Sequence, residues 1–144
     1  MKTRVLFVCI HNSARSQMAE AFANAVGDGQ VEAESAGITP GSLNPNVVQV
    51  MREIGFDISR NKTKDVFDFV KRGKLFHFVI TVCDEASAER CPILPGVTKR
   101  LHWSFPDPSS FVGTQAEVLT QTRQVRDEIR TKVTSWVDTL QVKA

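Results

Sequence analysis

The stretch 5–16, VLFVCIHNSARS, limits the possible folds of this chain more than any other part of it. Residues 5–8 are apolar and rich in β-branched valine, a composition typical of a buried strand. Small and polar residues follow, and a helical pattern begins at Arg15. A loop from a strand into a helix lets successive backbone N–H groups converge on one point, where the helix N-terminus adds positive potential. The stretch therefore predicts a binding site for a tetrahedral oxyanion.

Cys9 and Arg15 stand at the two ends of that loop. An arginine can bind two oxygens of an oxyanion in a bidentate manner, and a helix N-terminus or a nearby cation lowers the pKa of a cysteine thiol. The alternative is that Cys9 is a core cysteine at the end of a strand, a common place for that residue. The position between a strand and a helix favours a nucleophile beneath a bound oxyanion.

Composition indicates the class of protein. A chain of 144 residues can bury a substantial core as one domain. A net charge of +2 with 24% charged residues lacks the basic excess of a nucleic-acid-binding protein. The apolar run at 5–8 is too short for a signal peptide or a membrane span. We therefore expect a soluble cytoplasmic protein that binds neither nucleic acid nor membrane, and we expect it to be a monomer.

The chain has three cysteines, Cys9, Cys83 and Cys91. An odd number in a chain without a secretion signal favours catalytic or redox thiols over a framework of structural disulfides. Zinc binding usually needs ligands in close pairs, and seven residues separate Cys83 from Cys91 with no neighbouring CxxC. Zinc is therefore a minor alternative.

Turn residues and hydrophobic spacing divide the chain into alternating strands and helices. Strands are expected at 5–8, 31–35, 76–82 and 99–103. Helices are expected from Arg15 to a stop at Gly27, from the cap Asn44 to a stop at Gly55, at 65–72 and at 115–140, with a helical turn at 84–90 and irregular structure at 91–96. This alternation predicts one α/β domain over 1–144, in which helices cover both faces of a four-stranded parallel sheet with strand 5–8 at its centre.

Three candidate reactive groups follow predicted strands. Cys9 comes after the first strand, Cys83 after the third and Asp107 after the fourth, and the carboxyl ends of parallel strands open on the same edge of a sheet. A displacement at an oxyanion needs an acid that protonates the departing oxygen. Asp107 by itself reads as a turn residue, because 106–109, PDPS, is ordinary turn chemistry. Beside Cys9 and Arg15 we interpret it as the acid.

Residues 8–20, VCIHNSARSQMAE, resemble the signature of the low-molecular-weight protein tyrosine phosphatases, and more specifically of the thioredoxin-linked arsenate reductases built on that fold. Further similar segments cover nearly the whole chain: ESAGI at 34–38, NP at 44–45, DIS at 57–59, VCD at 82–84, CPILP at 91–95, HW at 102–103, DP at 107–108 and RQVRDEI at 123–129. The resemblance implies a flavodoxin-like strand order of 2-1-3-4.

The resemblance also implies a role for individual residues. Cys9 corresponds to the nucleophile, Ser16 to a hydrogen-bond partner of its thiolate and Asp107 to the general acid. The oxyanion-binding loop corresponds to Ile10, His11, Asn12, Ser13, Ala14 and Arg15. Cys83 and Cys91 correspond to a redox relay that forms Cys9–Cys83 and then Cys83–Cys91 disulfides, with thioredoxin as the external reductant. The implied activity is reduction of arsenate to arsenite in arsenic detoxification.

Some members of this family hold a potassium ion behind the loop. The positions that match its ligands are Asn12, Glu20, Ser35 and Asp65. The resemblance therefore implies a structural potassium ion and no tightly bound cofactor besides it. Each of the four residues would equally serve as an ordinary loop or cap residue.

The chain departs from the family pattern at three points. Ala14 stands where many relatives carry a further cysteine, and His11, interpreted as a surface residue of the loop rim, replaces a common glycine. The spacing between Cys83 and Cys91 is one residue longer than the family pattern, which bears on how that segment rearranges.

The alternative function is a phosphatase that hydrolyses phosphate monoesters with Cys9, Arg15 and Asp107 alone. Phosphotyrosine-directed relatives carry tyrosines after the Asp-Pro pair, whereas serines stand at 109–110 and the chain has no tyrosine. A hydrolase also has no use for two further cysteines. A non-enzymatic oxyanion sensor would leave both the acid and those cysteines unexplained, so arsenate reduction is favoured.

Overall fold

The computed structural model describes residues 2–92, 94, 96–97 and 99–142. Its centre is one sheet of four parallel strands in the order β2-β1-β3-β4, which confirms the expected fold and strand order. The strands are β1 (Thr3–Cys9), β2 (Val31–Gly37), β3 (Phe78–Thr81) and β4 (Lys99–His102). The sheet order reverses between β1 and β3, and ligands of open α/β sheets bind at such a point.

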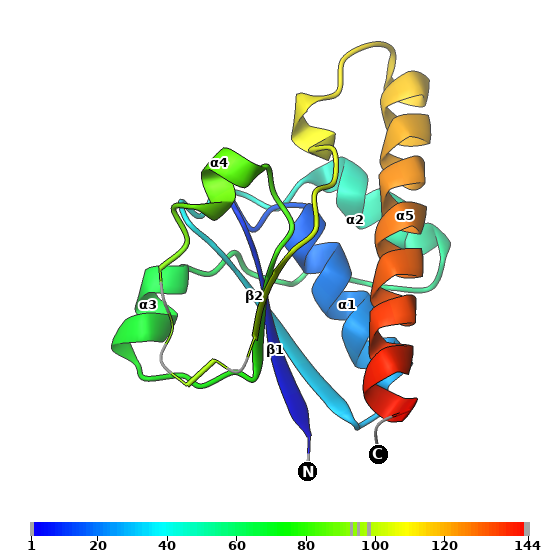
Figure 1. Ribbon diagram of the computed structural model, residues 1–144. Helices are drawn as coiled ribbons and strands as arrows, with labels where there is room; N and C mark the ends of the chain where they lie inside the picture. Colours follow the sequence, from blue (N-terminus) through cyan, green and yellow to red (C-terminus); the bar gives the residue numbers. More distant parts are fainter. Residues whose placement is uncertain (1, 93, 95, 98, 143–144) are drawn as a thin grey trace.

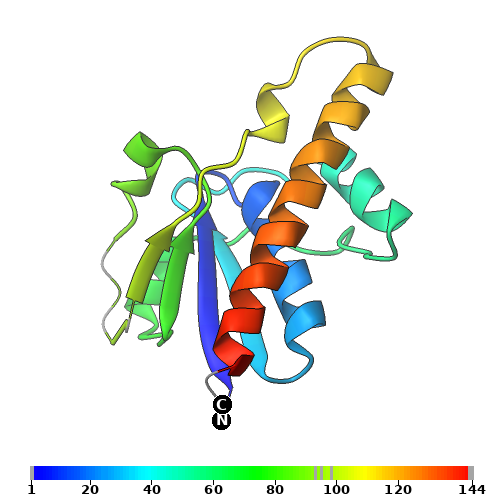
Figure 2. The same cartoon turned by 45° about the vertical axis from the view of Figure 1, so that its right-hand side comes forward.

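Helices lie on both faces of the sheet and beyond its carboxyl edge (Figures 1 and 2). Their bounds are α1 (Arg15–Gly27), α2 (Pro45–Glu53), α3 (Val66–Lys71), α4 (Glu85–Ala88), the 3-10 turn η1 (Pro108–Ser110) and α5 (Gln115–Val142). Helices α1, α2 and α5 pack together on one face, α3 covers the other, and α4 sits near the strand ends. Among the described residues, no helix combines the length and apolarity that a membrane span requires.

Alternate residues of β1 enter two separate cores. Val5, Phe7 and Cys9 belong to the core beneath α1, α2 and α5, whereas Leu6 and Val8 belong to the core beneath α3. All five are buried, which explains why this strand reads as a continuous apolar run rather than an alternating one. The strand that precedes the predicted oxyanion loop is therefore held rigidly from both faces.

Local signals place most element ends correctly. Asn44 caps α2 by accepting hydrogen bonds from the next amides, with Pro45 at the first helical position, as predicted. The third strand is shorter than the predicted 76–82, because only four residues pair in the ladder although Phe76 and Val82 are also buried. In the segment 91–96, which we expected to be irregular, residues 93 and 95 lie outside the described part of the chain.

Candidate active site

The loop between β1 and α1 turns its carbonyl groups outward. Donors outside the loop reach the carbonyl oxygens, at 2.7–3.1 Å, of Cys9, Ile10, His11, Asn12, Ser13 and Ala14. A trans peptide points each C=O opposite to the N–H of the following residue. The amides of residues 10–15 therefore face the inside of the loop. Ala14, the N-cap residue of α1, has no side chain that could occupy the first amides of that helix.

Asn12 gives the loop its shape. Its backbone lies in the left-handed region with φ of 55°, a conformation that asparagine tolerates better than most residues. The side chain is fully buried, and its Oδ1 accepts hydrogen bonds from the Lys64 amide at 3.0 Å and from Gln17 Nε2 at 3.1 Å. Its Nδ2 donates to Ser16 Oγ at 2.8 Å. Because the Lys64 amide can only donate, it fixes which end of the Asn12 side chain carries the oxygen.

The sulfur of Cys9 lies at the centre of this network. Ser16 Oγ is 2.9 Å from Cys9 Sγ, and the Asn12 amide donates to the same sulfur at 3.3 Å. Ser16 already accepts a hydrogen bond from Asn12 Nδ2, so its single proton is free for the sulfur. These contacts hold the Cys9 sulfur at the centre of the loop, and the thiolate is the form in which a cysteine acts as a nucleophile. Cys9 is buried at 2% exposure, with Arg15 equally enclosed at the start of α1.

Arg15 and Asp107 meet across the mouth of the loop. Arg15 Nη1 donates to the Phe105 carbonyl at 3.1 Å, and Arg15 Nη2 lies 3.7 Å from Asp107 Oδ2. The other oxygen of Asp107 accepts from the Ser109 amide at 3.0 Å and caps η1, so the residue does form the turn that its sequence context indicates. The same turn holds the second carboxylate oxygen toward Arg15.

Cys83 follows β3 and is fully buried in the same core as Cys9. Burial raises the pKa of the Cys83 thiol to about 11, with Arg15 acting to lower it and Cys9 to raise it further. At neutral pH the Cys83 thiol is therefore protonated. Cys83 and Cys9 share one buried core at the carboxyl ends of β3 and β1.

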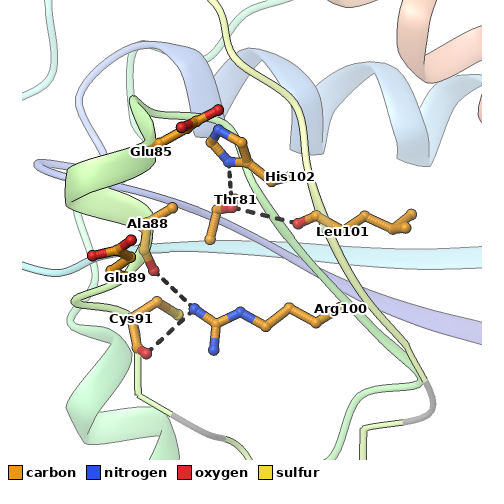
Figure 3. A pocket seen from close by; sticks show the side chains of 8 residues that line it. All are labelled: Thr81, Glu85, Ala88, Glu89, Cys91, Arg100, Leu101 and His102. Carbon is orange, nitrogen blue, oxygen red and sulfur yellow. Dashed lines mark hydrogen bonds between the residues drawn. The ribbon is translucent and has the colours of Figure 1, made fainter.

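Cys91 belongs to the other core, beneath α3. Cys91 lines an open hollow of about 590 Å³ between α4 and β4. Figure 3 shows its side chain together with the others that line this hollow. The side chain of Arg100 extends across that hollow. Its Nη2 donates to the carbonyls of Ala88 at 2.8 Å and Cys91 at 3.3 Å. Burial raises the pKa of the Cys91 thiol, and Arg100 acts to lower it. All three cysteines are free thiols, and the fold brings Cys9 and Cys83 together while Cys91 stays apart.

Comparison with known proteins now identifies the family. The family model described as low molecular weight phosphotyrosine protein phosphatase matches residues 4–144. The chain belongs to this family.

Arsenate reductases stand out among the similar members of the phosphatase family. The arsenate reductase of Bacillus subtilis is 40% identical over 137 residues, which cover 94% of this chain and 95% of that protein. A solved arsenate reductase in the phosphate-binding state has a TM-score of 0.75 and 31% identity, over 96% of this chain and 98% of the other. A thioredoxin-dependent arsenate reductase of Corynebacterium glutamicum has a TM-score of 0.73 and 27% identity, over 99% of this chain and 63% of that one.

The four residues that match the family's potassium ligands lie in different settings here. Glu20 Oε1 accepts from Ser35 Oγ at 2.9 Å and lies 3.3 Å from the ammonium of Lys64. Asn12 Oδ1 is occupied by two donors, and Asp65 Oδ1 accepts from the Phe67 amide at 2.8 Å as the cap of α3. A potassium ion fits poorly, because a side-chain cation already neutralises Glu20.

Three residues that shape this phosphatase-family site were not predicted from the sequence. Gln17 donates from Nε2 to the Asn12 carbonyl and to Lys62, and Lys64 contacts both Asn12 and Glu20. Gly37 lies so close to the loop that a Cβ there would come within 2.8 Å of the Ile10 carbonyl. The glycine falls inside the similar segment 34–38 and was within reach of sequence analysis. The other two act through contacts that no local pattern encodes.

Proposed function

We propose that this protein reduces arsenate to arsenite with its three cysteines. The observation that carries the proposal is the setting of Cys9, whose sulfur accepts a hydrogen bond from the Asn12 amide and contacts Ser16 Oγ inside a loop of inward-facing amides. Cys83 is buried beside it. The similar proteins named arsenate reductases support the choice of arsenate among tetrahedral oxyanions.

In the first step the Cys9 thiolate attacks arsenic while the loop amides and Arg15 bind the remaining oxygens. One arsenic–oxygen bond breaks, and its oxygen leaves as water after accepting a proton from Asp107. The product is a covalent Cys9–arsenic(V) adduct. The guanidinium and amides stabilise the charge that builds up on the oxygens during this displacement.

In the second step the Cys83 thiolate attacks Cys9 Sγ. A disulfide forms between the two residues, and the electron pair of the sulfur–arsenic bond stays on arsenic. Arsenic(V) thereby becomes arsenic(III) and leaves as arsenite, while the two sulfurs together lose two electrons. Cys83 is buried in the same core as Cys9, which supports Cys83 rather than Cys91 as the thiol that attacks Cys9.

In the third step Cys91 attacks Cys83, which frees Cys9 and leaves a Cys83–Cys91 disulfide for an external dithiol. Cys91 starts in the other core, so the segment between the two cysteines must rearrange. Helix α4 has four residues, and helices this short are marginal in water. The thioredoxin-dependent arsenate reductase among the similar structures supports thioredoxin as the reductant.

Phosphate monoester hydrolysis is the second candidate, because Cys9, Arg15 and Asp107 suffice for it and the family model is named for a phosphatase. Thioredoxin oxidation, followed with and without arsenate, distinguishes the two functions when run beside hydrolysis of a small aryl phosphate. We expect arsenate-dependent oxidation of thioredoxin and slow ester hydrolysis. Fast hydrolysis without arsenate-dependent oxidation would contradict the proposal.

A further inference from the structure

A carboxylate lies partly buried directly behind the oxyanion loop. The side chain of Glu20, on α1, is 17% exposed and accepts a hydrogen bond from Ser35 Oγ on β2. The side chain of Lys64 is 33% exposed, and its ammonium approaches the same Glu20 oxygen to 3.3 Å. Removing one partner of such a pair leaves the other charge poorly compensated.

The backbone of Lys64 is attached to the loop as well. Its amide donates to Asn12 Oδ1 at 3.0 Å, and its carbonyl accepts from the Gly37 amide at 2.7 Å. One residue therefore joins Glu20 through its side chain to Asn12 through its main chain.

A continuous series of hydrogen bonds leads from Lys64 to the nucleophile. Asn12 receives the Lys64 amide and donates to Ser16 Oγ, which in turn contacts Cys9 Sγ at 2.9 Å. The donor and the acceptor are fixed in the first two links, and in the third Ser16 Oγ and Cys9 Sγ share one hydrogen bond. A shift of residue 64 changes the position of the Asn12 amide group and, with it, the donor that reaches the sulfur.

We propose that Lys64 is a positioning residue whose ammonium supplies the positive charge behind the oxyanion loop, so that the loop keeps its shape without potassium. The proposal deepens the proposed function, since it takes Cys9 as the nucleophile. Its tests use no arsenate and no turnover, so failure of the arsenate assay would leave them valid.

The first test is thermal unfolding in potassium, sodium and tetramethylammonium chlorides at equal ionic strength. The wild type should unfold at one temperature in all three salts. Lys64→Met should unfold at a lower temperature and regain part of the loss in potassium or sodium but not in tetramethylammonium, because the oxygens of Glu20 and Ser35 suit a bare alkali cation. Lys62→Met is the matched control, since it removes an equal charge from an exposed neighbour and should respond like the wild type.

The second test measures the reactivity of the Cys9 thiol directly. The rate at which iodoacetamide alkylates Cys9, measured at one pH with Cys83 and Cys91 replaced by serine, should fall roughly tenfold in Lys64→Met. Potassium should restore most of that rate, and Lys62→Met should not change it. A residue that served general stability alone would leave the alkylation of the folded protein unaltered.

A third variant keeps the test decisive if Lys64→Met folds poorly. The double variant Lys64→Met/Glu20→Gln removes both charges, so it should be more stable than Lys64→Met and gain nothing from potassium. Three results would overturn the proposal. They are a potassium-specific rise in the unfolding temperature of the wild type, equal behaviour of Lys64→Met and Lys62→Met, and no gain from the added Glu20→Gln.

Discussion

Ser16 shows at the scale of one residue how this site directs its hydrogen bonds. Its hydroxyl accepts from Asn12 Nδ2 at 2.8 Å, keeps one proton to donate, and lies 2.9 Å from Cys9 Sγ. The direction follows from the Lys64 amide, which can only donate to Asn12 Oδ1. The resemblance to the family implies the contact between Ser16 and Cys9, whereas the contact between Ser16 and Asn12 needs the structure.

Arg15 should contribute most of the binding and stabilisation of the oxyanion by side chains. Replacing it by alanine removes the bidentate cation next to the loop, and we expect kcat/KM for arsenate to fall by roughly 10²–10³, as for loss of one oxyanion donor. Arg15→Lys keeps the charge but loses the planar guanidinium, so its kcat/KM should lie between the values of the wild type and of Arg15→Ala. Steady-state kinetics of the three proteins test this expectation. A loss below about tenfold in Arg15→Ala would mean that the arginine serves the fold.

Cys83 should make arsenite release depend on pH. Burial raises its pKa to about 11, so the thiolate is the minor form at neutral pH, and its fraction grows about tenfold for each unit of pH below that value. If Cys83 attack limits a single turnover, the rate of arsenite release should rise with pH in the same way. Rapid-quench measurements between roughly pH 7 and pH 9 would show it. A flat profile would mean that adduct formation itself activates Cys83.

At the scale of elements, local chemistry predicts where helices and strands begin. Asn44 and Pro45 define the start of α2, and the apolar residues after Arg4 define β1. The limits of β3 depend on pairing with β1 and β4, which the run of apolar residues does not encode. The contact between Lys64 and Asn12 joins residues 52 positions apart, so no spacing rule finds it.

Gly37 at the end of β2 should control the shape of the oxyanion loop. A Cβ there would come within 2.8 Å of the Ile10 carbonyl and 2.9 Å of the Asn12 amide, both of them backbone atoms. We expect Gly37→Ala to displace the loop and weaken phosphate binding by roughly tenfold or more, the usual cost of overpacking. Gly41→Ala is the control, because its nearest neighbour is His11 Cβ at 3.4 Å. Equal phosphate affinities by calorimetry would contradict this role.

At the scale of the whole molecule, the sheet separates Cys91 from Cys9 and Cys83. Cys9 and Cys83 lie in the core beneath α1, α2 and α5, and Cys91 lies in the core beneath α3. The sequence places Cys9 and Cys83 at the same edge of a parallel sheet, and the structure bears that out. The sequence does not show on which side of the sheet Cys91 is buried, because the residues that follow it are rich in proline and glycine and have no periodic pattern.

This separation makes Cys91 the residue on which the proposed relay depends. A serine at that position leaves the first two steps intact and removes the third. The segment that follows Cys83 must also open, which requires Arg100 to release the carbonyls of Ala88 and Cys91.

The most direct test adds arsenate once to the Cys91→Ser variant and measures both the arsenite released and the disulfide formed, by mass spectrometry of peptides. The account predicts about one arsenite per protein and a Cys9–Cys83 disulfide that persists. Cys83→Ser, treated in the same way, should stop earlier at the arsenic adduct. Sustained thioredoxin-driven turnover by Cys91→Ser would contradict the relay and leave Cys91 as a packing residue.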